Sequence, residues 1–138
     1  MRKILFLFFI PLIFAQCQET AEEVLEQTAA EERPLIIDED GIYTEWYPGH
    51  QQIKIKGRKD DNGEKTGIWK MYTPRGVEKS ITVYDSGKRN GHIVVRHDNG
   101  AIHYTGEYEM GVRVGEWKFY DENGNFVSSE DFGYPALD

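Results

Sequence analysis

The sequence contains a single cysteine and no long apolar stretch. Cys17 is the only cysteine among 138 residues, so no disulfide can form within one chain. The longest apolar run extends from Ile4 to Ala15 and is broken only by Pro11. A transmembrane helix needs about 20 apolar residues, so this run is too short to span a membrane. We therefore expect neither a disulfide-stapled fold nor a membrane-spanning helix.

Sequence motifs of catalysis are also missing. The region after Cys17 offers no cysteine nucleophile, no Gly-x-Ser-x-Gly turn and no phosphate-binding glycine loop leading into a helix. Asp60 begins an acidic run that ends at Glu64, but the run lacks the alternating ligands and the distal glutamate of a calcium loop, and we interpret it as a turn. The sequence predicts no catalytic residue and no cofactor.

Three histidines lie close together in the sequence and raise the question of a metal site. If Asn99-Gly100 forms a two-residue turn, His97 lies opposite Ile102, on the other face of the sheet from His92 and His103. Three ligands would then not converge, and we predict no metal site.

The first residues have the pattern of an export signal. Met1-Arg2-Lys3 is positively charged and precedes the apolar run, so we interpret residues 1–16 as a signal peptide. The stretch Ile13-Phe14-Ala15-Gln16-Cys17 resembles the lipobox of bacterial lipoproteins. This resemblance implies that Cys17 is lipidated and anchors the protein in a membrane of the bacterial cell envelope, in the outer membrane or facing the periplasm. The alternative is ordinary cleavage after Cys17, which would leave a soluble exported protein without a thiol.

Residues 17–42 are strongly acidic. From Gln18 to Gly41 the chain has nine acidic residues and one base, Arg33, whereas residues 43–138 have fifteen acids and thirteen bases. A segment with this composition cannot bury much apolar surface, although Val24 and Leu25 could join a weak helical stripe. We interpret it as a tether, largely disordered or weakly helical, that precedes a folded domain of residues 43–138.

The folded region repeats itself with a period of 24 residues. Residues 69, 93 and 117, at this spacing, are Trp69, Ile93 and Trp117. Three sets of glycines recur at the same spacing: Gly63, Gly87 and Gly111; Gly67, Gly91 and Gly115; and Gly76, Gly100 and Gly124. A fixed period of this length is typical of arrays in which each supersecondary unit packs on its neighbours.

Each unit has the pattern of a β-hairpin. In the third unit, alternation predicts one apolar face and one polar face. The apolar set is Ile102, Tyr104 and Tyr108, joined by Trp117 and Phe119, and the polar set is His103, Thr105 and Glu107. Asn-Gly pairs predict tight turns. Gly57 and Gly106, within strands, predict a bulge or an aromatic ring lying over the backbone.

The second and last units depart from the pattern. In the second unit Ile81 and Val83 are out of phase with the apolar residues of the third. Either the turn before this strand is one residue longer and reverses the register, or the strand packs on both faces. The last unit is half a repeat, in which Phe126 and Phe132 match Ile102 and Tyr108, as expected of a terminal cap.

Aromatic residues are the best candidates for ligand contact. A single-layer sheet cannot bury both faces, so some of the repeated aromatics should remain on an exposed surface. Tyr72 and Tyr120 follow Met71 and Phe119, and alternation therefore places them opposite the packed side chains. We predict binding through Tyr72 and Tyr120, with Trp46 and Tyr47 as further candidates.

The units, of the form Tyr-x-x-x-Gly, alternating strand, Gly-x-x-x-Gly and Trp-x-Phe-Tyr, resemble MORN repeats, and more closely the bacterial MORN-repeat variants, some of them antitoxin-like. The resemblance covers about residues 43–132. It implies an all-β fold, an elongated single-layer antiparallel sheet of repeated β-hairpins, that binds or scaffolds proteins and is not an enzyme. We expect protein partners in the cell envelope or self-association, a membrane contact through Cys17, and no nucleic acid. The alternative is an antitoxin or immunity-type inhibitor of one toxin or hydrolase.

Overall fold

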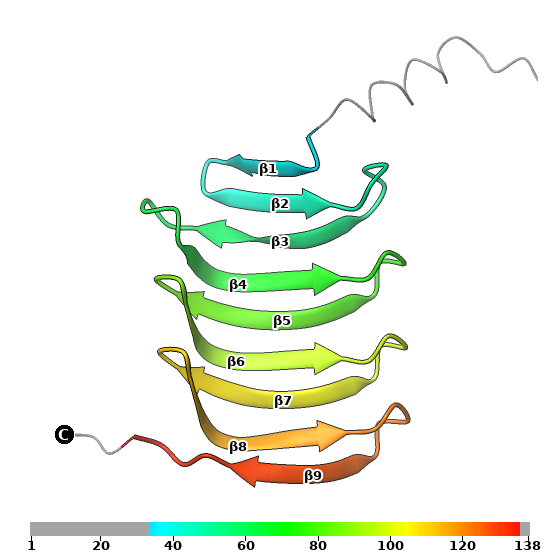
Figure 1. Cartoon of the computed structure of the whole chain (residues 1–138), viewed down its shortest axis with the longest axis vertical. Helices are drawn as coiled ribbons and strands as arrows, with labels where there is room; N and C mark the ends of the chain where they lie inside the picture. Colours follow the sequence, from blue (N-terminus) through cyan, green and yellow to red (C-terminus); the bar gives the residue numbers. More distant parts are fainter. Residues whose placement is uncertain (1–33, 136–138) are drawn as a thin grey trace, which may run out of the picture.

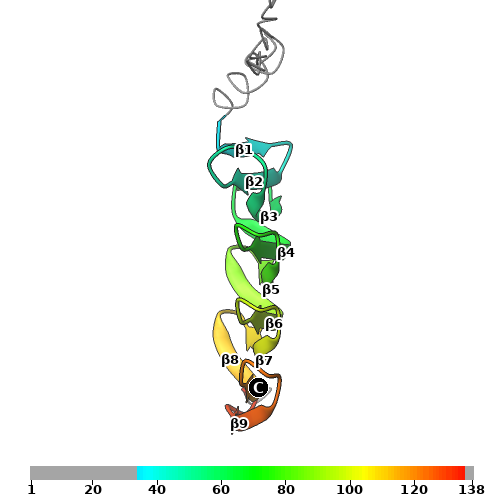
Figure 2. The same ribbon diagram turned by 90° about the vertical axis from the view of Figure 1, so that its right-hand side faces the viewer.

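A computed structural model describes residues 34–135 of the chain. These residues form one nine-stranded antiparallel sheet in which every strand pairs with its neighbours in sequence (Figure 1). Seen edge-on, the sheet is one layer thick (Figure 2). The all-β, single-layer hairpin fold is thus confirmed. The strands are β1 (Ile36–Glu39), β2 (Ile42–Trp46), β3 (Ile53–Lys59), β4 (Lys65–Tyr72), β5 (Glu78–Asp85), β6 (Lys88–Arg96), β7 (Ile102–Glu109), β8 (Val112–Tyr120) and β9 (Phe126–Asp131).

The sheet begins earlier than the sequence predicted. Strand β1 starts at Ile36, seven residues before the expected boundary at residue 43, and its Ile36 pairs with Glu45 of β2. The sequence did not predict this strand because residues 38–40 are all acidic. In the structure they belong to a hairpin that turns at Asp40-Gly41, and Asp38 forms an ion pair with Lys59. The predicted signal peptide, Cys17 and the tether up to residue 33 lie outside the described residues. No helix within residues 34–135 could span a membrane.

Two-residue turns lie on only one edge of the sheet. Three turns on this edge have positive φ at both positions, as a type I′ turn requires, among them Met110 (φ 48°) and Gly111 (φ 93°). The fourth turn of this edge, between β3 and β4, and the turns of the other edge are longer. At one of them the amide of His97 donates to the carbonyl of Ala101, and the amide of Gly100 donates back to His97. The Asn-Gly pairs therefore do mark turns, but Asn99-Gly100 is not a two-residue turn.

Two tryptophans form the centre of the packed face. Trp117 is 1% exposed and Trp69 is 4% exposed, and each indole lies over a glycine of the adjacent strand. A Cβ on Gly106 would lie 2.3 Å from Cδ2 of Trp117, and one on Gly57 would lie 2.2 Å from Cδ2 of Trp69. These strand glycines are required for space, as the sequence predicted. We call this side of the sheet the packed face; it carries Tyr43, Trp69, Tyr84, Tyr104, Tyr108, Trp117 and Phe119.

The second unit has the same strand register as the other units but a different pair of residues on the packed face. Thr82 pairs with both Trp69 and Ile93, so it lies on the packed face, and Ile81 and Val83 lie on the opposite face. The turn before it has the same length as the later turns, since Thr73 and Val77 are bonded as His97 and Ala101 are. A longer turn is therefore excluded. Where tryptophan is replaced by the smaller Ile93, the glycine beneath it is replaced by the larger Thr82.

Cations cover the aromatic rings at the same period. Lys65 lies over the rings of Trp69 and Tyr84, and its equivalents 24 and 48 residues later, Arg89 and Arg113, lie over Tyr108 and Trp117. A cation over an indole or phenol ring contributes about 0.5–1 kcal/mol at an exposed site. These three cations therefore close the packed face along one edge.

The C-terminal segment caps the array. Strand β9 is exposed along its whole length, and the chain after it continues alongside β8, where the amide of Phe132 donates to Gly115 and that of Gly115 donates to Gly133. The ring of Phe132 packs against Trp117 with centroids 6.1 Å apart. Phe132 thus occupies the place that its match to Tyr108 predicted.

Candidate binding surface

The second side of the sheet is less covered, and we call it the open face. It carries Tyr72 and Tyr120, as alternation predicted, because Lys70 and Lys118 two residues earlier lie on the same side. Trp46, Tyr72, Arg96 and Tyr120 occupy equivalent positions at the ends of β2, β4, β6 and β8, each next to a bulge in the pairing. Three of the four units thus place an aromatic residue on one line across the open face.

Tyr72 and Tyr120 do not form one site. Four strand spacings of about 4.8 Å separate them, which is roughly 19 Å. Tyr120 packs against Phe126, an exposed residue of β9, with centroids 6.0 Å apart. Tyr72 belongs instead to a groove near the other end of the array. A ligand that touches both tyrosines must be extended across the sheet.

Trp46 and Tyr47 are involved in internal contacts. The hydroxyl of Tyr47 donates to the backbone carbonyl of Tyr72 over 2.9 Å, which ties the β2–β3 turn to the end of β4. Trp46 packs 6.1 Å from the ring of His50, and its buried Nε1 has no hydrogen-bond partner among the described residues. These contacts position Tyr72 and make Tyr47 a supporting residue of the groove.

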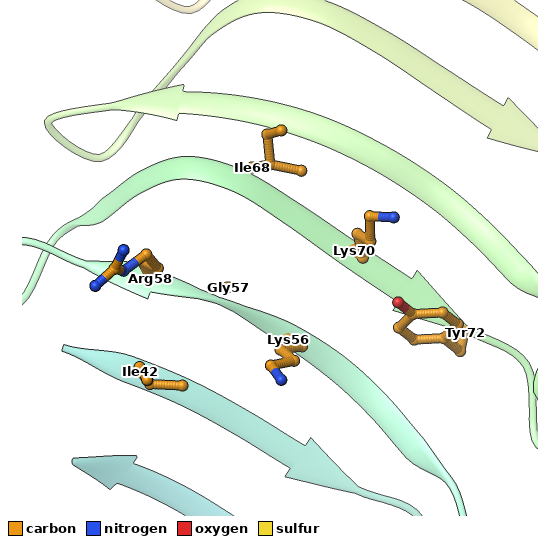
Figure 3. Close-up of a pocket in the computed structure, with 7 residues that line it drawn as sticks. All are labelled: Ile42, Lys56, Gly57, Arg58, Ile68, Lys70 and Tyr72. Carbon is orange, nitrogen blue, oxygen red and sulfur yellow. The ribbon is translucent and has the colours of Figure 1, made fainter. Parts of the chain in front are cut away.

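The groove crosses strands β2, β3 and β4 on the open face (Figure 3). It has a volume of about 460 Å³, which lies within the usual range of small-ligand sites. Its walls are mainly apolar, and Ile42 and Ile68 remain exposed although they line it, Ile68 by 58%. It is lined by Ile42, Lys56, Gly57, Arg58, Ile68, Lys70 and Tyr72.

Basic side chains border this apolar groove. Lys70 donates to Glu78 over 3.0 Å, and this hydrogen bond raises the pKa of Lys70. Lys56 and Arg58 are exposed and form no ion pair with an acid of residues 34–135. The groove therefore combines exposed apolar surface with positive charge that no acid of residues 34–135 pairs.

The basic run from Lys54 to Lys59 is divided between the two faces. Lys54 pairs with Glu45 over 2.6 Å, and Lys59 pairs with Asp38 and lies over the ring of Tyr43 on the packed face. Only Lys56 and Arg58 reach the groove. The acids Asp60 and Asp61, which the sequence placed against this run, are in the following turn.

A second hollow lies on the open face at the equivalent place of the third and fourth units. Gly106 and Trp117 correspond to Gly57 and Trp69, so the residues beside them correspond as well. At this second place Glu107 stands where the groove has Arg58, and Glu116 stands where it has Ile68. The two hollows thus share their backbone geometry and differ in charge.

The second hollow is partly covered by the chain itself. Tyr134, from the segment after β9, lines it and donates its hydroxyl to Glu107 over 3.1 Å. This hydrogen bond raises the pKa of Tyr134. A terminal segment of the chain thus already contacts the open face, through the neutral hydroxyl of Tyr134.

The placement predicted for the histidines is wrong in one respect. The rings of His97 and His103 are 4.2 Å apart, although we expected them on opposite faces. The cause is the longer turn, together with a register shift after Val95, which takes His103 out of strict alternation. Burial, followed by the charge on His97, lowers the pKa of His103. Within residues 34–135 no three His, Cys, Asp or Glu side chains gather as metal ligands would.

Sequence reasoning found Tyr72 but not the other groove residues. The signal was present, because Lys56, Arg58, Ile68 and Lys70 alternate with Gly57 and Trp69 and must lie on the opposite face from them. Comparison with models of known families, with curated proteins and with solved structures found no match to the chain.

Proposed function

We propose that the protein is a non-enzymatic binding module, anchored in the bacterial cell envelope, that holds protein partners on the open face of its sheet. The observation that carries this proposal is the groove beside Tyr72, where exposed apolar side chains lie next to Lys56 and Arg58, which pair with no acid in the described part of the chain. An exposed apolar patch rimmed by charge is typical of a protein interaction site. The packed face, by contrast, is closed by its own aromatic residues and cations.

The anchoring part of the proposal rests on the N-terminal sequence. A positively charged start, an apolar run and Cys17 together have the pattern of a bacterial lipoprotein signal. A lipid on Cys17 would hold the sheet at a membrane by way of the acidic segment, and no nucleic acid would take part. The repeat pattern supports a scaffold through its resemblance to MORN arrays, in which an elongated sheet offers several contact points along its length.

The proposal is tested with a double tyrosine variant and a control on the packed face. Replacing both Tyr72 and Tyr120 by alanine should remove partners that co-purify with the tagged full-length protein from crosslinked cells. Met71→Ala is the matched control, because Met71 precedes Tyr72 on β4 but is exposed on the packed face. Unchanged partner recovery in the Tyr72→Ala, Tyr120→Ala variant would contradict the proposal.

A second candidate function is inhibition of one toxin or hydrolase. The groove favours it, since about 460 Å³ can accept a few side chains of one particular partner. This candidate predicts a single partner recovered in a one-to-one ratio. Recovery of several envelope proteins, or of further copies of the chain, would instead support the scaffold.

A further inference from the structure

We propose that the groove on β2–β4 is occupied, when no partner is bound, by the chain's own acidic segment of residues 22–32. The inference rests on the proposed function, because it names what a partner must displace from the open face. It predicts a self-docked state in which Glu22, Glu23 and Glu26 lie against Lys56 and Arg58. Val24 and Leu25 then cover the exposed apolar wall.

Charge complementarity selects this segment. Lys56 and Arg58 have no acidic partner among residues 34–135, and the groove they border is apolar. Between Gln18 and Arg33 the chain supplies six glutamates together with Val24 and Leu25. This segment offers carboxylates that can pair with the two cations and apolar side chains that can cover the apolar walls.

The point where the described chain begins also fits. The carbonyl of Pro34 is 3.0 Å from Nε2 of His50, in the β2–β3 turn, and Tyr47 of the same turn holds the end of β4 at Tyr72. The acidic segment therefore joins the sheet at the Tyr72 end of the groove. Three strand spacings, roughly 14 Å, separate β1 from β4. Extended chain spans about 3.3 Å per residue, so five residues already cover that distance.

The tether length also favours binding within one molecule. Ten flexible residues have a root-mean-square end-to-end distance of roughly 17 Å, close to the distance to be spanned. A short tether of this kind gives an effective concentration in the millimolar range. Even a weak interaction, with a dissociation constant of about 1 mM, would then keep the groove occupied about half the time.

The opposite end of the same face provides a precedent. Tyr134 of the C-terminal segment lies on the equivalent hollow and donates to Glu107. At the groove Arg58 replaces this glutamate, so a donor stands where the second hollow has an acceptor, and a carboxylate can accept there as Glu107 accepts from Tyr134. The chain's two terminal segments would thus cover equivalent hollows.

The experiment compares two positions of β4 that differ in the face they occupy. A photo-crosslinking amino acid is placed at Ile68, in the groove, or at Met71, on the packed face; these residues are 58% and 43% exposed. The full-length tagged chain is irradiated in cells, and crosslinked peptides are mapped by mass spectrometry. We expect Ile68 to attach to a peptide from residues 18–33 in a species of monomer mass. We expect Met71 to give no such product.

Charge variants then test the pairing. Lys56→Glu with Arg58→Glu should abolish the crosslink from Ile68, and adding Glu22→Lys, Glu23→Lys and Glu26→Lys should restore it. A variant that merely misfolds would not be restored by the second set. The circular dichroism melting curve of each variant checks that the sheet is retained.

Other products at Ile68 overturn the inference. A species of twice the monomer mass that contains residues 18–33 would place the segment of a second copy in the groove. Absence of any product with residues 18–33, with or without attachment to a lipid, would show that the segment does not bind there. None of these outcomes decides the proposed function, because partner capture at Tyr120, outside the groove, is measured independently.

Discussion

The exchange of Gly106 and Trp117 for Thr82 and Ile93 between units leads to a quantitative prediction. Gly106→Thr with Trp117→Ile would transfer the second unit's pair into strands β7 and β8. If the glycine is present only to make room for the indole, each single change should be strongly destabilising. The double change should be much less destabilising than the sum of the two.

The structure sets the magnitudes. A Cβ at Gly106 would lie 2.3 Å from Cδ2 of Trp117, and the indole cannot move away because it is 1% exposed. Overpacking of this kind costs about 1–3 kcal/mol or more, and we expect Gly106→Thr to fall at the upper end. Trp117→Ile removes buried volume and should cost about 3 kcal/mol. Contacting residues couple by about 0.5–3 kcal/mol, and we expect a coupling above about 1 kcal/mol here.

The assay is urea unfolding of the four proteins of this double-mutant cycle, followed by far-ultraviolet circular dichroism. The coupling free energy is the departure of the double variant from the sum of the two single variants. Additive losses would refute the reasoning, because they would mean that the glycine does not serve the tryptophan. The same cycle at Gly57 and Trp69 should give the same sign, since a Cβ at Gly57 would lie 2.2 Å from the indole.

Two further predictions concern the turns. Met110 has φ 48° and is exposed, so Met110→Asn, which creates the favoured Asn-Gly turn, should raise the free energy of unfolding by about 1 kcal/mol. A decrease in urea unfolding midpoint would contradict this. Asp121 accepts hydrogen bonds from the side chain and backbone of Asn125 and from the amide of Asn123, and these bonds lower the pKa of Asp121. Its contribution to stability is therefore present above the unfolded-state pKa and is lost as pH falls through the folded-state pKa. Asp121→Ala should therefore lower the melting temperature at about pH 6 and have little effect at about pH 2; an equal loss at both would contradict the assignment.

The hairpin array could be predicted because period and alternation both survive in the sequence. Glycine spacing located the turns, and the two-residue period placed Trp69 and Trp117 on one face and Tyr72 and Tyr120 on the other. Strand β1 was missed because its four residues include two acids, and pairing with β2 compensates for their low strand preference.

Other features depend on tertiary geometry that the sequence does not encode locally. The contact of His97 with His103 follows from a turn of unexpected length and a bulge, which move side chains by one position. The groove depends on which cations find partners across strands. Lys54 and Lys59 are paired with Glu45 and Asp38, and only the register of β1, β2 and β3 reveals this.

The central claim is that the open face binds envelope proteins. It is tested most directly by in-cell photo-crosslinking of the full-length tagged protein from Tyr120, on the open face, and from Met71, on the packed face, with mass spectrometry of what is attached and in what ratio. The account predicts capture of envelope proteins or further copies from Tyr120 and not from Met71, and a single one-to-one partner would favour the inhibitor over the scaffold. Capture of no protein from Tyr120, or of the same proteins from both positions, would contradict it.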